Sequence, residues 1–287
     1  MINNTPAFKI HNSKVITKKI IHIVLVLILL VVILVPFYIS VVYAFRAAND
    51  VGMNRLAWPK NPTWENFRIV LTENEVFLTG YKNSLLNTIP SVLILVFVTS
   101  MAAYVLARNK GKFYKIMYAV FTVGILIPFQ CIMLSLYLNF YNLGLASTNI
   151  GYIIARVGMQ VSISVLVVTS FVKTIPYELE EAALIDGAGK FTIFWKIVFP
   201  LMRSVNLTQI VLNTLFCWND YNVAIVLLRK KSSKTLPLAQ IIYFNENTSE
   251  LNYAFAFFLM TIVPILLLYF CLQKYIVKGI TSGAVKG

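Results

Sequence analysis

Residues 20–45 read IIHIVLVLILLVVILVPFYISVVYAF, a run of 26 residues between Lys19 and Arg46 without Asp, Glu, Lys or Arg. A bilayer core about 30 Å thick needs roughly 20 helical residues to cross it. The run exceeds the ~7–15 apolar residues of a secretory signal, and no A-x-A cleavage pattern follows it. It therefore predicts a retained transmembrane helix.

Three further charge-free runs contain 25, 40 and 23 residues, at 83–107, 116–155 and 251–273. The longest exceeds one crossing and is interrupted by polar residues at 139–149, so it predicts two helices with a short loop between them. The second of these helices continues to about Val172 and contains Arg156. A further stretch from about Leu201 to Leu228, with Arg203 near one end and Asp220 inside, adds one more span. The six predicted transmembrane helices lie near residues 20–45, 83–107, 116–138, 150–172, 203–228 and 253–275. Four of their residues are prolines, which membrane helices tolerate when neighbours satisfy the freed carbonyls: Pro36, Pro90, Pro128 and Pro264.

The composition agrees with an all-α, polytopic membrane protein. Hydrophobic residues make up 59% of the 287 and charged residues 13%, against about 45–50% and about 25% in soluble domains. An ordinary soluble enzyme and a soluble nucleic-acid binder are thereby excluded. The net charge of +14 is what basic cytoplasmic loops would give.

The basic residues predict the orientation of the chain. With the N-terminus inside, 15 of the 25 Lys and Arg fall on inner segments, nine on outer segments and Arg156 within a span. The positive-inside rule then predicts that both termini are cytoplasmic, although the outer basic cluster at 229–234 opposes it. The predicted segments are a cytoplasmic 1–19, a first helix 20–45, an extracellular loop 46–82, a five-helix core 83–276 containing a cytoplasmic loop 174–200, and a cytoplasmic tail 277–287.

No catalytic or metal-binding constellation is visible. The histidines are His11 and His22 alone, and no Ser/His/Asp set or metal-ligand spacing can be assembled. Gly189-Lys190 fails as a phosphate-binding loop, since Leu184 stands where the first Gly is needed and Phe191 where Ser or Thr is needed. The sequence predicts a non-enzymatic chain without a cofactor or a metal of its own.

The loop between the fourth and fifth predicted helices carries the most specific pattern, TIPYELEEAALIDGA at 174–188. Pro176 suits the first position of a helix, and Gly187 permits the positive φ that ends one. Three acids fall in the first turns, where the helix dipole favours negative charge: Glu178, Glu180 and Glu181. A second amphipathic stretch runs from Phe191 to Phe199, before Pro200. The physical pattern fits a surface that docks on another protein, and it equally fits a polar connection between two spans.

The residues of this loop resemble the EAA loop of ABC-importer permeases, whose coupling helices sit in a cleft of the ATP-binding subunit. The matching positions are Glu181-Ala182-Ala183, Asp186-Gly187-Ala188, Ile197 and Pro200. The resemblance implies that Glu181, Ala182, Ala183, Asp186, Gly187 and Ala188 couple this chain to an ATPase.

Other segments over roughly residues 60–287 resemble the maltose-type carbohydrate permeases. They are NPTWENF at 61–67, NSL at 83–85, WNDY at 218–221, TLPL at 235–238 and VKGITSGAVKG at 277–287. In that family the tail enters the interface between the two ATPase subunits, which implies ATPase contacts for Ser282, Gly283, Lys286 and Gly287.

The resemblance implies a type I ABC importer permease fold and one half of a carbohydrate translocation path in a bacterial plasma membrane. The implied partners are a second homologous permease, two ATP-binding subunits that hold ATP and Mg, and an extracellular solute-binding protein. The alternative is a stand-alone secondary carrier or channel for a small polar solute. Such carriers often contain internal repeats, and none is visible here.

Asp220 lies inside a predicted span, where a charge costs about 2.5–3.5 kcal/mol on insertion scales and is a functional candidate. Together with Trp218, Asn219 and Tyr221 it lines a sugar path, or it pairs with a neighbouring helix, or it lies closer to the outer surface; the sequence leaves all three open. Arg156 is expected to extend toward the outer surface.

Overall fold

The computed structural model describes residues 7–50, 56–243 and 250–284, with side chains described from Lys18 to Gln273 except at Ala48 and in the two gaps. These residues form helices and connecting turns, without a strand among them. The α-helices are α1 (Ala7–Ala44), α2 (Glu65–Thr72), α3 (Phe77–Arg108), α4 (Lys112–Ile125), α5 (Phe129–Asn142), α6 (Asn149–Val172), α7 (Glu178–Ile185), α8 (Lys190–Ile193), α9 (Phe199–Leu201), α10 (Arg203–Trp218), α11 (Asn222–Leu227), α12 (Leu236–Ala239) and α13 (Leu251–Ala284). Short 3-10 turns span Ala48–Asp50, Lys231–Ser233 and Gln240–Tyr243, and a π-helical segment spans Phe194–Val198.

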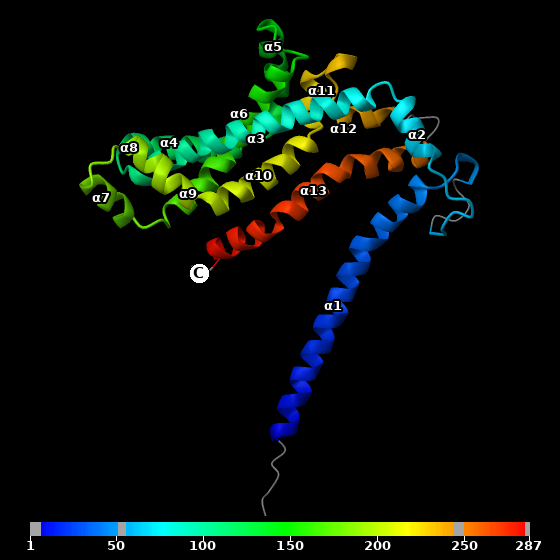
Figure 1. The fold of residues 1–287 in the computed structure, drawn as a ribbon, viewed down its shortest axis with the longest axis horizontal. Coiled ribbons are helices and arrows are strands. Elements are labelled where there is room, and N and C mark those ends of the chain that lie inside the picture. Colours follow the sequence, from blue (N-terminus) through cyan, green and yellow to red (C-terminus); the bar gives the residue numbers. More distant parts are fainter. Residues whose placement is uncertain (1–6, 51–55, 244–249, 285–287) are drawn as a thin grey trace, which may run out of the picture.

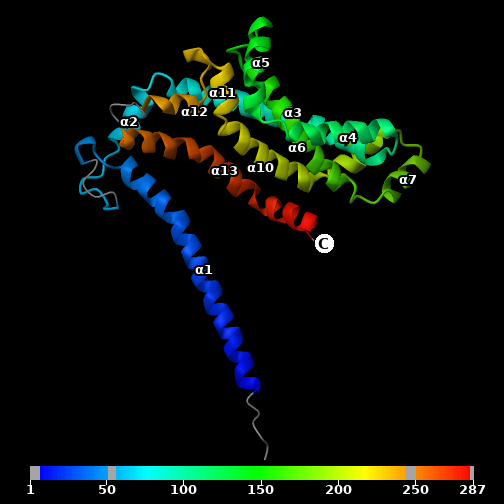
Figure 2. The same ribbon diagram turned by 180° about the vertical axis from the view of Figure 1, so that it is seen from behind.

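The centre of the molecule is α3, which packs against α6 and α10, while α13 lies along α10. Figure 1 shows α7 and α8 at one end of this bundle and α2 and α12 at the other. The carboxyl end of α13 is directed toward the α7 end in both views (Figures 1 and 2). α1 contacts α13 near its own carboxyl end, where the rings of Tyr43 and Phe255 are 5.4 Å apart, and then diverges from the bundle with its apolar side chains exposed.

Among the described residues, four helices are long and apolar enough to cross a membrane: Lys18–Ala44 within α1, then α3, α6 and the Leu251–Gln273 part of α13. They correspond to the first, second, fourth and sixth predicted spans. The third and fifth predicted spans are not continuous helices, so the prediction of six uninterrupted spans differs from the structure at these two places.

The third predicted span consists of α4 and α5, which meet at an angle of 100°. Pro128 precedes α5 as its N-cap, with φ −68° and ψ 139°. Proline offers no amide hydrogen to the preceding turn and keeps the residue before it out of helical geometry, so the helix is interrupted here. The other three prolines lie inside α1, α3 and α13, as predicted.

The fifth predicted span ends early because α10 stops at Trp218 and α11 begins only at Asn222. The Asp220 carboxylate accepts hydrogen bonds from the backbone amides of Ala224 (3.1 Å) and Val223 (3.4 Å). A side chain that satisfies the first amides of a helix favours a new helix start over a continued one. Asp220 therefore divides the expected span into two helices.

Asn66 joins three elements at the α2 end of the bundle. Its amide donates to the carbonyl oxygens of Ala44 and Arg46, both at 2.8 Å, and its oxygen accepts a hydrogen bond from Asn252 at 3.0 Å. The neighbouring ring of Trp64 packs edge-on against Phe45, with centroids 4.7 Å apart. The NPTWENF segment therefore ties the end of α1 to the start of α13.

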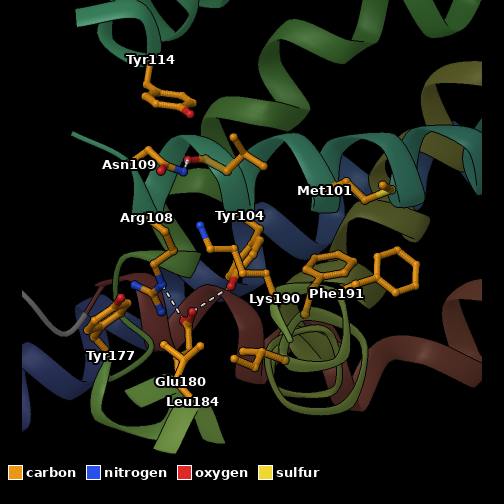
Figure 3. Close-up of a pocket in the computed structure, with 13 residues that line it drawn as sticks. Met101, Tyr104, Arg108, Asn109, Tyr114, Tyr177, Glu180, Leu184, Lys190 and Phe191 are labelled. Atoms are coloured by element: carbon orange, nitrogen blue, oxygen red, sulfur yellow. Dashed lines mark hydrogen bonds and ion pairs between the residues drawn. The ribbon is translucent and has the colours of Figure 1, made fainter. Parts of the chain in front are cut away.

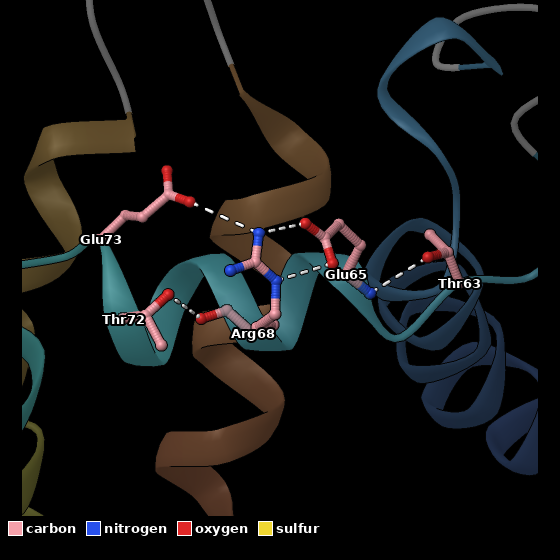
Figure 4. A network of polar contacts seen from close by, with 5 residues as sticks. All are labelled: Thr63, Glu65, Arg68, Thr72 and Glu73. Carbon is pink, nitrogen blue, oxygen red and sulfur yellow. Dashed lines mark hydrogen bonds and ion pairs between the residues drawn. The ribbon is translucent and has the colours of Figure 1, made fainter.

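The outward surface of α2 carries an exposed polar network (Figure 4). Arg68 Nε donates to Glu65 at 2.8 Å, and the Arg68 guanidinium lies 3.6 Å from Glu73. The hydrogen bond from Arg68 holds the pKa of Glu65 below its ordinary value. Because these side chains are solvated, such pairs contribute little to stability.

We expect Asn66→Ala to lower the free energy of unfolding by about 1–3 kcal/mol, since buried acceptors and the amide of Asn252 lose their partner. Asn61→Ala makes the same chemical change at an exposed position five residues earlier and should have no measurable effect. Denaturant titration of the purified protein in mixed micelles measures both. Equal effects of the two variants would contradict the proposed junction.

Candidate functional site

The loop at residues 174–200, here called the elbow, forms the end of the bundle opposite α2 (Figure 1). α7 carries Glu178, Glu180 and Glu181 in its first turn, as predicted, and starts two residues after Pro176 rather than at it. Gly187 has φ +82°, and the Ala188 amide donates to the carbonyl of Ala183 at 2.9 Å. The predicted helix, glycine turn and second helical stretch are therefore confirmed.

The six coupling candidates divide into an exposed set and a packed set. Ala183 and Ala188 are half-buried against the core formed with α3 and α6. The remaining four are exposed: Glu181, Ala182, Asp186 and Gly187. Two large apolar side chains of the elbow are also open, Ile185 at 86% and Phe191 at 71% exposure. Apolar side chains gathered beside acids on an exposed turn indicate a surface for another protein.

Glu180 fastens α7 to the end of α3 (Figure 3). Its carboxylate accepts a hydrogen bond from Arg108 Nε at 2.6 Å and one from the Tyr104 hydroxyl at 2.9 Å. Arg108 also donates to the carbonyl of Ile175 at 2.9 Å, and its guanidinium lies 5.7 Å from the centre of the Tyr177 ring. The side chain of Glu180 is 4% exposed and that of Arg108 13%.

The sequence analysis names Glu180 only as one of three acids that suit the start of a helix, and predicts no partner for it. The relevant signal was its spacing, since Glu180 and Ala183 are three residues apart and so share one face of a helix. Its partner Arg108 lies 72 residues earlier, and no spacing rule connects residues that far apart. The three side chains Tyr104, Arg108 and Glu180 are called the clamp below.

A cavity of about 490 Å³ lies beside the clamp, between the end of α3 and the helices α7 and α8. Lys190 and Phe191 line it together with the clamp residues (Figure 3). The elbow therefore has open space next to the contact that attaches it to α3.

The stretch from Phe191 to Phe199 is helical, as predicted, but includes the π-helical turn. Pro200 has no amide hydrogen for the carbonyl one turn earlier, and proline within a helix commonly shifts the local hydrogen-bond register. α10 then begins at Arg203, where the fifth predicted span begins. Side chains of this stretch, among them Ile193 and Val198, are buried against Val168 and Val172 of α6.

The four residues predicted for a sugar path have different environments. Trp218 is 5% exposed, its indole donates to the carbonyl of Thr261 at 3.1 Å, and its ring packs edge-on against Tyr81. Asn219 and Tyr221 are exposed and line a cleft of about 510 Å³ whose wall includes Asp220. Polar side chains thus remain available in this cleft, while Trp218 is engaged within the bundle.

Asp220 and Arg156 form a buried pair instead of reaching solvent. Each residue is 8% exposed, and Arg156 Nη1 lies 3.7 Å from Asp220 Oδ1. The Tyr152 hydroxyl donates to the other carboxylate oxygen at 3.0 Å. The expectation that Arg156 extends toward the outer surface was wrong. The Asp220 carboxylate, between α10 and α11, lies within reach, and pairing with it removes the free-energy cost of a lone buried charge.

Four tail residues are predicted to contact an ATPase. Ser282 and Gly283 lie on the backbone of α13 with their side chains outside the described set, and Lys286 and Gly287 lie outside the described residues. Within the residues whose side chains are described, no group of three or more His, Cys, Asp or Glu is placed to hold a metal ion.

We expect Asp220→Ala to lower the free energy of unfolding by about 3–5 kcal/mol, since it leaves Arg156 buried without a counter-charge. Asp220→Asn should cost less, because its oxygen can still accept the amides that start α11. Asp186→Ala, at an exposed acid, serves as the control and should leave stability unchanged. Denaturant titration in mixed micelles separates these variants. Equal losses of stability in Asp220→Ala and Asp220→Asn would contradict the role of Asp220 in starting α11.

The sequence matches known transport proteins along most of its length. Residues 83–282 match the family model described as the binding-protein-dependent transport system inner membrane component. The chain is 36% identical over 251 residues to the probable starch degradation products transport system permease protein AmyC of Thermoanaerobacterium thermosulfurigenes, covering 88% of this chain and 91% of the relative. It is 34% identical to the multiple sugar-binding transport system permease protein MsmG of Streptococcus mutans, over 88% and 92% of the two chains. The melibiose/raffinose/stachyose import permease protein MelC of Bacillus subtilis is likewise 34% identical, over 88% and 91%.

A chain in the crystal structure of a bacterial ABC transporter for the import of the acidic polysaccharide alginate has the same fold, with a TM-score of 0.79 and 22% identity over 96% of this chain and 99% of that one. The family match decides against a stand-alone carrier or channel. The chain belongs to the binding-protein-dependent transport system inner membrane components, the multi-pass permease family of ABC importers.

Proposed function

We propose that this chain forms one half of the membrane path of a carbohydrate importer, and that its elbow docks into a cleft of a separate ATP-binding subunit. The observation that carries the proposal is the exposed face of the elbow, where Glu181 and Asp186 flank an apolar side chain, Ile185, that is 86% exposed. A neighbouring subunit that covers this face would bury Ile185 and contact the carboxylates of Glu181 and Asp186.

The carbohydrate class is supported by the relatives, whose names refer to starch degradation products, multiple sugars and the melibiose, raffinose and stachyose group. The complete importer would contain a second homologous permease, two ATP-binding subunits and an extracellular solute-binding protein. ATP and Mg would be bound by the ATP-binding subunits, and this chain would contribute no catalytic step and no cofactor.

The orientation that suits this proposal has the elbow in the cytoplasm. The α7 end of the bundle and the carboxyl end of α13 point the same way (Figure 1), and the basic residues favour a cytoplasmic position for both termini. The NPTWENF junction at the other end would then face the solute-binding protein.

Transport in this proposal is a two-state motion without chemistry on the sugar. Closure of the ATP-binding pair displaces the elbow, and the helices of the bundle carry the displacement into the membrane. Access to the path thereby changes from the inner to the outer side, where the binding protein releases the sugar.

Within the path we assign direct sugar contacts to Asn219 and Tyr221, which have exposed polar groups in the 510 Å³ cleft. Asp220 and Trp218 hold this segment in place through their own contacts with Arg156 and Thr261. An amide and a phenol beside one another suit a sugar, which offers hydroxyl groups and an apolar ring face.

Enlarging Gly187 tests the docking. We expect Gly187→Leu to lower sugar uptake and co-purification of the ATP-binding subunit by at least about tenfold, which corresponds to about 1.4 kcal/mol. An added Cβ at Gly187 meets nothing within 4 Å in this chain, but its φ of +82° strains any larger residue, so the control must carry the same backbone strain. Gly144 is a matched control, since it has φ +68° and equally open surroundings, and Gly144→Leu should retain the ATP-binding subunit. Labelling of residues 178–188 from outside intact cells would contradict the proposal.

Truncating Tyr221 tests the path. We expect Tyr221→Ala to raise the sugar concentration for half-maximal uptake about two- to tenfold, the range of one aromatic contact of about 0.5–1.5 kcal/mol. The amount of bound ATP-binding subunit should not change. Ile225→Ala, exposed on α11 but outside this cleft, is the control. Equal effects of both variants on uptake would remove Tyr221 from the path.

A further inference from the structure

The polar attachment of α7 to the bundle is made by one buried side chain, beside the half-buried contact of Ala183. Within α7, all of which the structure describes, Glu180 is the only buried residue. Along the backbone, α7 is joined to α6 by the turn at 173–177 and to α8 by a turn that contains Gly187 and Gly189. The turn to α8 bends easily because it contains glycine, so it transmits a push on α7 poorly, and neither turn leads to α3.

The clamp bypasses both turns and reaches α3, a helix that is not adjacent to the elbow in sequence. Arg108 makes three contacts with residues 175–180, through the carboxylate of Glu180, the carbonyl of Ile175 and the ring of Tyr177. Tyr104, one turn earlier on α3, holds the second carboxylate oxygen. Charged hydrogen bonds fix direction as well as distance, so α7 cannot slide along α3 while they are intact.

The opposite end of α3 is bonded to the segment that follows α11. Asn83 donates to the carbonyl oxygens of Ser232 (2.8 Å) and Lys234 (3.0 Å), and the Ser84 hydroxyl accepts the amide of Leu236 at 3.0 Å. The backbones also approach closely, since a Cβ added at Gly80 would lie 3.3 Å from the amide nitrogen of Leu236. At 1.5 Å per residue, the 24 residues from Ser84 to Arg108 span about 36 Å.

We propose that the Glu180–Arg108 ion pair is the connection through which movement of the elbow reaches α3, and that α3 carries it to residues 231–239 at the far end of the bundle. The inference rests on the docking proposed above, since the elbow must first be moved by an ATP-binding subunit. Glu180 and Arg108 are therefore positioning residues, whereas Glu181 and Asp186 face the partner.

The test uses the complete importer, with its binding protein, in liposomes, and measures sugar taken up per ATP hydrolysed. Glu180→Gln and Arg108→Gln remove one charge each at nearly constant shape. We expect this ratio to fall at least about fivefold, the lower end of usual couplings between sites, while the ATP-binding subunits remain bound. Glu178→Gln and Lys110→Gln are the matched controls, because both side chains are exposed neighbours on the same helix and just after α3, and their ratio should not change.

A purely structural role would lower the amount of transporter without changing uptake per ATP. If the single-charge variants do not accumulate, two other variants provide the test. Tyr104→Phe keeps the ion pair and should lower uptake per ATP by less. The double variant Arg108→Glu with Glu180→Arg reverses the ion pair and should restore part of the ratio. An unchanged ratio in the variants would overturn the proposal. Loss of the ATP-binding subunits from the complex that contains Glu180→Gln would also overturn it, because Glu180 would then act in docking. A wild-type complex without any ATP-binding subunit would instead refute the docking itself.

Discussion

A charge buried in a medium of low polarity must meet a counter-charge, and this requirement organises both ends of the bundle. At the elbow, Arg108 of α3 meets Glu180 of α7. Near the start of α6, Arg156 meets Asp220, whose carboxylate accepts the first amides of α11. Each pair joins segments more than 60 residues apart in the chain. The elbow and the break after α10 are therefore each fixed by an ion pair, whereas the bend between α4 and α5 follows from Pro128.

At the α2 end of the bundle, neutral polar residues also join separate segments, and burying them costs less free energy than burying charges. Asn66 bridges α1, α2 and α13, while Asn83 and Ser84 bind the segment before α12. In each case a side-chain amide or hydroxyl satisfies backbone groups that a helix end leaves without partners. Two of the short segments that resemble carbohydrate permeases, NSL and TLPL, contact one another here. Their residues hold loops and helix ends together, and this explains why short polar segments occur next to long apolar spans.

Much of the architecture could be predicted because the bilayer imposes a simple rule on charge. Long runs without Asp, Glu, Lys or Arg predicted α1, α3 and α13, a less clean apolar stretch around Arg156 predicted α6, and the positions of Pro176 and Gly187 predicted α7 to within two residues. The failures have local causes that a hydropathy rule does not include. Pro128 interrupts a span that is apolar throughout, and Asp220 starts a helix where apolar neighbours suggested a continuous one. Arg156 was placed at the surface because its partner lies 64 residues later, and Glu180 was passed over in favour of its neighbour Glu181 for the same reason.

The contrast between the ends and the middle of the bundle bears on how such a molecule can move. In the middle, α3 and α10 share a hydrogen bond between Ser100 and Asn206 at 3.1 Å, and α6 and α10 share one between Ser164 and Asn213 at 3.4 Å. Neutral contacts of this kind between membrane helices average about 0.6 kcal/mol. Breaking a charged pair costs several times more, because it leaves a buried charge behind. Helices joined firmly at their ends and weakly along their length can shift against one another as rigid bodies without losing their attachments, which is the motion that alternating access requires.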